Sequence, residues 1–119
     1  MIPIKSEQEI TIMREGGKIL AQILADVIKR VKPGVSTQEL NDFAHELMQD
    51  AGVEPVFLGY HGYTGVLCAS VNNEVVHGIP NPRAILSDGD ILGLDIGIRY
   101  RGLCTDMART VAVGSIALA

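Results

Sequence analysis

Several features that would assign a protein to a broad class are missing from this sequence of 119 residues. No apolar run reaches the roughly 18 residues that a membrane-spanning helix needs. No signal peptide is visible, because residues 6–14 are polar and charged where an apolar segment should lie. Lys and Arg number 10 against 14 Asp and Glu, and the net charge of −4 disfavours nucleic acid as a ligand. We therefore expect neither a membrane nor a nucleic acid as a partner.

Cysteine is scarce as well. The two cysteines, Cys68 and Cys104, lie in apolar stretches without the spacing of metal ligands. Buried free thiols are predicted, with a disulfide as the less favoured alternative. Free thiols are typical of a reducing compartment, so we expect a cytoplasmic protein. Linkers and repeats are absent, and the length suits a single domain over residues 1–119.

Two amphipathic helices are predicted in the first half of the chain. A capping box begins each of them, Ser6 with Glu9 in the first and Ser36 with Glu39 in the second. Apolar or small residues then recur at intervals of three and four, which places them on one helix face. These are Ile10, Met13, Gly17, Leu20, Leu24, Val27 and Val31 in the first helix, and Leu40, Phe43, Leu47 and Ala51 in the second. A Pro-Gly pair after the first run and a glycine after the second are expected to end the helices.

From residue 53 onward the apolar pattern changes from helical to alternating. Residues 66–71, 91–98 and 103–113 are predicted strands, and Asn72-Asn73 is a turn signal. The last two strands would form a hairpin around Tyr100-Arg101-Gly102. Two helices followed by an antiparallel sheet make the expected fold class α+β.

Each strand of this hairpin carries one aspartate on the face that holds its small residues. If the turn is centred on Tyr100-Arg101, Asp95 and Asp106 are directly opposed, with β-carbons about 4.5–5.5 Å apart. Opposed like charges destabilise a sheet, so a cation should compensate them, and alternation places Arg109 on the other face. Carboxylates suit hard divalent ions such as Mn²⁺, which predicts a metal site. The alternative is a hydrated surface pair in a slipped register.

Several motifs follow one another in a fixed order along the chain. They are Gly59-Tyr60-His61-Gly62-Tyr63, Cys68-Ala69-Ser70-Val71-Asn72 and Val76-His77-Gly78-Ile79-Pro80. Asp95 and Asp106 then follow His77 at matching intervals. In these motifs and their spacing, the chain from about residue 4 to residue 114 resembles a type I methionine aminopeptidase.

The resemblance implies an activity, a fold and a metal centre. Members of this family are metal-dependent aminopeptidases that remove the initiator methionine from nascent proteins. They have the pita-bread fold, of which this chain would be the N-terminal half. Asp95 and Asp106 match two ligands of a centre that holds two divalent ions such as cobalt, manganese, iron or zinc, and Asp106 matches the bridging ligand. The remaining ligands, a histidine and two glutamates, belong to a second half without a counterpart here, so we expect little activity from this chain alone.

A substrate pocket is also implied by the resemblance. His77 matches a catalytic histidine that contacts the substrate and helps to stabilise the transition state. Tyr60 and Tyr63 match aromatic residues that line the pocket for the N-terminal methionine, and Cys68 lies near that pocket. Thr64 stands where the family usually has proline, so the shape of the pocket segment is expected to differ there.

Other functions stay open from the sequence. Pita-bread relatives without intact metal ligands serve as non-catalytic interaction modules. Proline-specific peptidases of the same fold are a weaker option, disfavoured by the motifs around Tyr60 and His77. Half of a pita-bread fold would leave apolar surface and strand edges open, so we expect a homodimer or association with a complementary C-terminal half.

Overall fold

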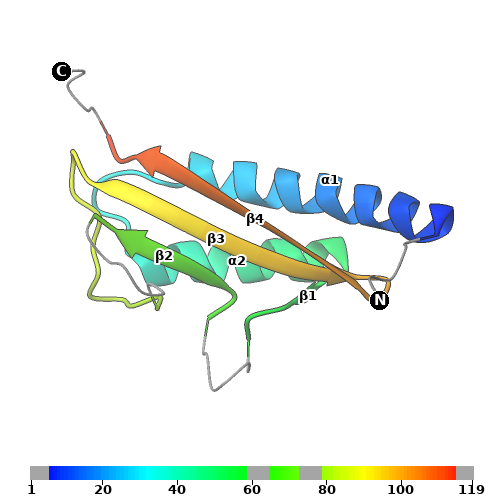
Figure 1. Cartoon of the computed structure of the whole chain (residues 1–119). Coiled ribbons are helices and arrows are strands. Elements are labelled where there is room, and N and C mark those ends of the chain that lie inside the picture. The colour runs from blue at the N-terminus through cyan, green and yellow to red at the C-terminus, as the bar shows by residue number, and fades with distance from the viewer. Residues whose placement is uncertain (1–5, 59–64, 73–78, 115–119) are drawn as a thin grey trace.

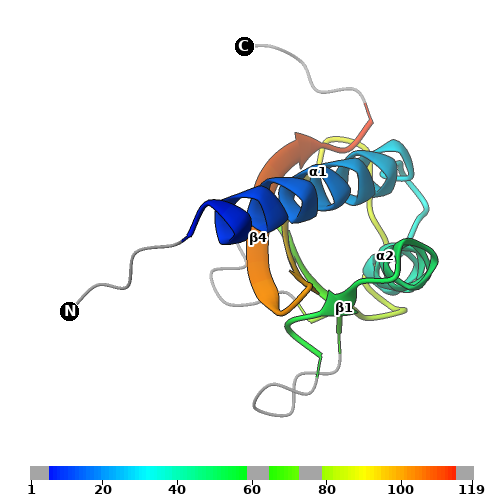
Figure 2. The same cartoon turned by 90° about the vertical axis from the view of Figure 1, so that its right-hand side faces the viewer.

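The computed structural model of the chain describes residues 6–58, 65–72 and 79–114. The elements in chain order are α1 (Glu7–Lys29), α2 (Thr37–Ala51), β1 (Glu54–Pro55), β2 (Leu67–Val71), β3 (Ile91–Tyr100) and β4 (Leu103–Ala112). Both helices lie on one side of an antiparallel sheet in which β3 pairs with all three other strands (Figures 1 and 2). The predicted α+β fold is confirmed. The short strand β1 was not predicted, because its two residues show no alternation of their own.

Local hydrogen bonds set the ends of both helices. The Ser6 hydroxyl accepts from the Glu9 amide and the Glu9 carboxylate accepts from the Ser6 amide, which completes the predicted capping box. At the start of α2 the Ser36 hydroxyl accepts from the Glu39 amide. α2 ends at Gly52, whose φ of 72° is left-handed. In the described part of the chain, neither helix is long and apolar enough to cross a membrane.

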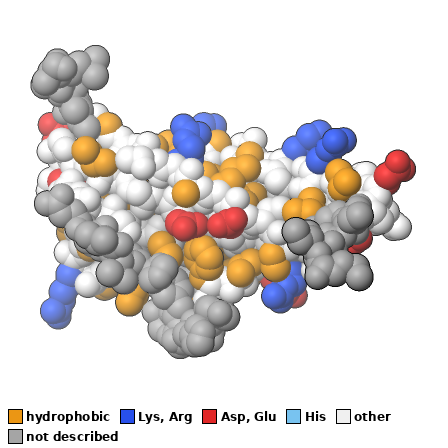
Figure 3. Space-filling view, viewed as in Figure 1, with side chains coloured by type: hydrophobic (Ala, Val, Ile, Leu, Met, Phe, Trp, Pro, Cys, Tyr) orange, Lys and Arg blue, Asp and Glu red, His pale blue; other side chains and the backbone are white. Residues whose placement is uncertain are grey.

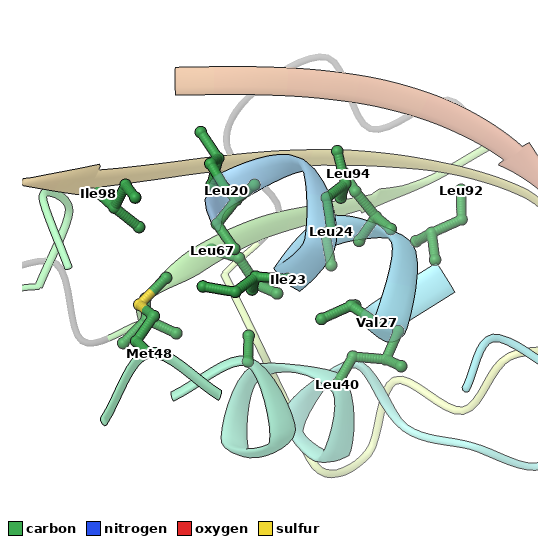
Figure 4. Close-up of a cluster of buried hydrophobic side chains, with 14 of the residues drawn as sticks. Leu20, Ile23, Leu24, Val27, Leu40, Met48, Leu67, Leu92, Leu94 and Ile98 are labelled. Carbon is green, nitrogen blue, oxygen red and sulfur yellow. The ribbon is translucent and has the colours of Figure 1, made fainter. Parts of the chain in front are cut away.

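The hydrophobic core fills the space between the helices and the sheet (Figure 4). Four large side chains of α1 point into it, and α2 and β3 close it from the other sides. The fully buried members include Leu20, Val27, Leu40, Met48, Leu67, Leu92, Leu94, Ile96 and Ile98. This layer covers the helix side of β3, the central strand of the sheet, from Leu92 to Ile98.

The buried stripe of α1 differs from the predicted one. Gly16 is buried rather than Gly17, and Ile10 is 41% exposed. The cause is the end of β3, because a methyl group added at Gly16 would lie 3.3 Å from the Tyr100 β-carbon. The Tyr100 hydroxyl also donates to the Glu15 carboxylate at 3.0 Å, which raises the pKa of the tyrosine. A tertiary contact therefore selects the face that this helix buries.

In α2 the buried stripe also departs from the prediction. Ala44 and Met48 are buried with Leu40, whereas Phe43 and Leu47 are half-buried and Ala51 is exposed. The stripe is therefore turned toward the side of the helix that meets the sheet.

The β3–β4 hairpin turns at Arg101-Gly102. Both residues have positive φ, 50° and 83°, as in the type I′ turn that suits the twist of a two-residue hairpin. The predicted centre at Tyr100-Arg101 is wrong by one residue. Glycine adopts positive φ without a steric penalty, so the turn includes Gly102. Every residue of β3 consequently pairs two positions further along β4 than predicted.

The two faces of the sheet differ in chemistry. On the helix side, Leu92, Leu94, Ile96 and Ile98 of β3 are at most 1% exposed, and Tyr100 at the end of the strand is half-buried. The other side carries mainly small and polar residues, with Ile91 at one end, and no described helix covers it (Figure 2). Its members include Ser70, Gly93, Asp95, Gly97, Cys104, Asp106, Ala108 and Thr110, which we call the open face.

Candidate metal centre

Asp95 and Asp106 both project from the open face. Asp95 lies on the central strand β3 and pairs with Ala108, whereas Asp106 lies on β4 and pairs with Gly97. The two aspartates are therefore diagonal neighbours, and the prediction that they are directly opposed is wrong. Their shared face is as predicted, because a register shift of two residues preserves the alternation of side chains. Diagonal neighbours lie about 7–8 Å apart, close enough for polar side chains and an ion to link them.

Small residues stand across from both carboxylates in the hairpin. Gly97 stands next to Asp106 and is buried, and a methyl group added there would lie 3.5 Å from the β-carbons of both Asp106 and Val56. Ala108 occupies the corresponding position beside Asp95. Acidic side chains gather near the middle of this face with apolar side chains around them (Figure 3). A side chain at Gly97 would therefore meet both Asp106 and Val56.

The two aspartates differ in burial. Asp95 is half-buried, with its Oδ1 atom removed from solvent, and its neighbour across β2 is Cys68. Asp106 is exposed, because β4 is the outer strand of the described sheet. The central strand thus holds one carboxylate in a restricted position and leaves the other accessible.

Both cysteines are free thiols. Cys68 is 8% exposed, as predicted. Cys104 is exposed, and its predicted burial is wrong, since it lies on the open face near the turn. Cys68 pairs directly with Asp95, and Cys104 lies two residues from Asp106 on the same face of β4.

The donor set suits a divalent cation in part. Carboxylate oxygens are the ligands that hard divalent ions prefer. Arg109 pairs with Leu94 and lies on the other face, as predicted, so it does not neutralise the pair. Over residues 6–58, 65–72 and 79–114, no group of three or more His, Cys, Asp or Glu side chains could hold a metal. The described residues thus offer two carboxylates, and further ligands have to come from elsewhere.

Three predicted site residues, Tyr60, Tyr63 and His77, lie outside the described residues, as does Thr64. Their predicted roles remain predictions.

The chain directly before the His77 segment is held by a hydrogen-bond network. Asn72 has a left-handed backbone with φ of 55°, in agreement with the turn signal. Its side-chain oxygen accepts from the Ile91 amide at 2.9 Å, and its side-chain nitrogen donates to Asp90 at 3.1 Å. The Asp90 carboxylate also accepts from the Ser87 amide at 2.8 Å, and these bonds hold the pKa of Asp90 below its ordinary value. The end of β2 is thereby fixed against the start of β3.

A group of buried polar residues at the start of α2 was not predicted. Ser36, Thr37 and Asn41 are 3%, 1% and 6% exposed. Thr37 and Asn41 are four residues apart, the spacing that puts them on one helix face, and Asn41 is followed on that face by Met48. This spacing was a usable signal, but the predicted stripe included apolar residues alone.

Comparison with known proteins gives a consistent result. Residues 11–118 match metallopeptidase family M24. The chain is 46% identical over 116 residues to methionine aminopeptidase 1 of Bacillus subtilis, covering 98% of this chain and 46% of the relative. The crystal structure of methionine aminopeptidase from Rickettsia prowazekii superposes with a TM-score of 0.94 at 37% identity, covering 98% of this chain and 47% of that one. The Xaa-Pro dipeptidase from Bacillus anthracis superposes with a TM-score of 0.79 at 25% identity, covering 96% and 30%.

These relatives differ from the chain in length and differ from one another in how similar they are to it. The chain spans about half the length of the curated relatives it matches. Methionine aminopeptidases match it more closely than the proline-specific enzyme in both sequence and structure. Its two helices and antiparallel sheet form half of a pita-bread fold, as predicted, and the chain belongs to metallopeptidase family M24.

Proposed function

We propose that this chain contributes metal ligands and substrate-binding residues to a methionine aminopeptidase. The observation that carries the proposal is the placement of Asp95 and Asp106 on the sheet face that no described helix covers, with small residues across from both carboxylates. The sequence relation to methionine aminopeptidase 1 of Bacillus subtilis supports the choice of substrate. Substrates would be peptides or nascent chains that begin with methionine.

Asp95 and Asp106 would hold divalent ions, with Asp106 as the bridging ligand. Ions bound there would supply Lewis-acid chemistry, which lowers the pKa of water and polarises a peptide carbonyl. The partial burial of Asp95 restricts its carboxylate to few orientations, which favours a fixed ligand position. Asp106 is exposed and remains accessible to a second ion.

The other proposed residues act on the peptide. A neutral His77 imidazole would donate a hydrogen bond to the carbonyl oxygen of the first peptide bond as negative charge develops there. Tyr60 and Tyr63 would line the methionine pocket. Cys68 presents a soft, apolar thiol beside Asp95, which suits contact with the flexible methionine side chain.

Two carboxylates are too few to hold a catalytic ion tightly, because tight sites use more protein ligands with supporting hydrogen bonds. We therefore propose that these 119 residues alone have little or no peptidase activity, and that the missing ligands come from another segment. A cytoplasmic location is part of the same proposal and rests on the free cysteines.

A segment exchange tests the proposal. Residues 6–114 would replace the matching part of the Bacillus subtilis enzyme, and methionine release from a Met-Gly peptide would be measured with added Mn²⁺ or Co²⁺. The chimera should cleave the peptide, and Asp95→Asn or Asp106→Asn should each lower kcat/KM by more than about 100-fold, the upper range for residues that merely support ligands. Asp50→Asn, at an exposed position on α2, is the matched control and should leave kcat/KM unchanged.

The other outcomes separate the competing functions. A folded chimera that cleaves only Xaa-Pro peptides would favour the proline-specific class. A folded chimera without any peptidase activity would contradict the proposal and favour an interaction module.

Self-association is a second candidate function, and β4 favours it. This strand is ten residues long and pairs with β3 alone among the described strands. Its outer edge can pair with another strand, from a second copy of the chain or from a complementary C-terminal half. Light scattering after size exclusion should show a dimer of the isolated chain. A single species near 12.8 kDa at high concentration would contradict it.

A further inference from the structure

The first two turns of α2 bind two stretches of chain that are distant in the sequence. The Asn41 side-chain oxygen accepts from the Val66 amide at 2.7 Å. The Thr37 hydroxyl accepts from the Asn81 amide at 2.9 Å and donates to the Asn81 carbonyl at 3.2 Å. One helix therefore fixes the backbone at residue 66 and at residue 81.

These two stretches also contact each other. A methyl group added at Gly65 would lie 2.9 Å from Cγ and Cδ of Pro80 and 3.1 Å from the Asn41 side-chain oxygen. Separations this short leave no room for any side chain at Gly65. One contact therefore joins Gly65, Pro80 and Asn41. We call these three residues, together with Thr37, the α2 anchor.

The α2 anchor is buried, so breaking its hydrogen bonds is costly and they favour one geometry. Thr37 and Asn41, with Ser36, are the buried polar side chains of the described chain. A buried polar group that loses its partner is penalised by its desolvation, so an arrangement that breaks either bond is disfavoured. Buried polar networks of this kind specify one geometry for the segments they join.

The segments that end at the α2 anchor are those that carry the proposed substrate residues. Tyr60 and Tyr63 precede Gly65 by a few residues, and His77 precedes Pro80 by three. We propose that Thr37 and Asn41 are positioning residues, which set the methionine pocket and His77 relative to each other through the backbone. The roles of Tyr60, Tyr63 and His77 rest on the proposed function, whereas the coupling of the two segments does not.

Hydrogen exchange on the 119-residue chain tests the coupling. Thr37→Val and Asn41→Leu change the side-chain volume little. Each removes the hydrogen bonds of one side chain of the α2 anchor. If the anchor acts as a unit, each variant should speed amide exchange by about tenfold in both segments that it holds, residues 65–67 and 79–82, the scale of one lost buried hydrogen bond. Amides in the middle of β3 report global stability in the same sample and should change much less.

Two matched variants control for general effects. Thr11→Val removes a hydroxyl that donates to the Glu7 carbonyl in the first turn of α1, and it should leave both segments unchanged. Thr37→Ser keeps the hydroxyl that bonds to Asn81 and should retain slow exchange in both segments. Gly65→Ala should reproduce the effect of Asn41→Leu, because the added methyl meets Pro80.

Three results would overturn the coupling. They are a change confined to the segment nearest each substitution, no change in either segment, or an equally large change in Thr37→Ser. Exchange needs no turnover, so the result stands apart from the methionine-release assay of the chimera. Faster exchange in both segments together with an inactive chimera would retain the anchor and remove the proposed function.

Discussion

Asp95 and Asp106 lie on the same face of the β3–β4 hairpin and are offset by two residues, with Asp95 opposite Ala108 and Asp106 opposite Gly97. The offset separates the two charges more than direct opposition would. It also puts a residue without a bulky side chain across from each carboxylate. An ion between the aspartates would therefore have carboxylate oxygens on two sides.

Weak binding of divalent metal is the first prediction. Two carboxylates and water should bind Mn²⁺ with micromolar or weaker affinity, because tight oxygen sites use six or more ligands. Calorimetric titration of the 119-residue chain should show this, and the Asp95→Asn/Asp106→Asn double variant should abolish it. Asp50→Asn is the control. Nanomolar affinity would mean that this chain holds further ligands.

A small gain in stability is expected from Asp106→Asn without metal. Direct cross-strand pairs contribute roughly 0.2–1 kcal/mol, so a diagonal repulsion at an exposed position should contribute about 0.3 kcal/mol or less. Urea unfolding in chelator measures this change. With saturating Mn²⁺ the unsubstituted protein should instead be more stable than Asp106→Asn, since the ion stabilises the form that binds it. A clear loss of stability in chelator would show that the Asp106 carboxylate has a structural role.

The glycines of the turn and of α1 should respond in opposite directions. Gly102 has φ of 83°, so Gly102→Ala should lower the free energy of unfolding by about 1 kcal/mol. Gly17 is helical with no atom within 4 Å of an added methyl group, so Gly17→Ala should raise it by about 0.5–1 kcal/mol. Urea midpoints of both variants decide the matter. A neutral Gly102→Ala would place the turn elsewhere.

Acid should weaken the fold through Asp90. The Ser87 amide, and after it the Asn72 side chain, hold the pKa of Asp90 below its ordinary 3.8. Since the folded pKa is the lower one, the ionised carboxylate stabilises the fold above about pH 4 and loses this contribution as pH falls through the folded value. Unfolding curves of the protein and of Asp90→Asn should therefore converge as pH is lowered from about 6 to about 3. Curves that stay parallel would contradict this role.

Features that depend on neighbouring residues could be predicted from the sequence. The capping serines, the end of α2 at Gly52 and the shared face of Asp95 and Asp106 are all local. Capping needs residues three apart, and side-chain alternation needs only the parity of positions along a strand. The shared face thus survives the error in the hairpin turn, because the register moved by an even number of residues.

Features that depend on distant residues were decided by the tertiary structure alone. The contact of Tyr100 with Gly16 selects the buried face of α1. The hydrogen bond from Val66 to Asn41 and the contact of Gly65 with Pro80 join segments that no periodicity relates. Sequence patterns report which side of an element is apolar, but a buried polar group is stable only where a partner arrives from elsewhere in the chain. The sequence therefore determined which residues share the candidate metal site, and long-range packing determined how far apart they lie and what holds the chain around them.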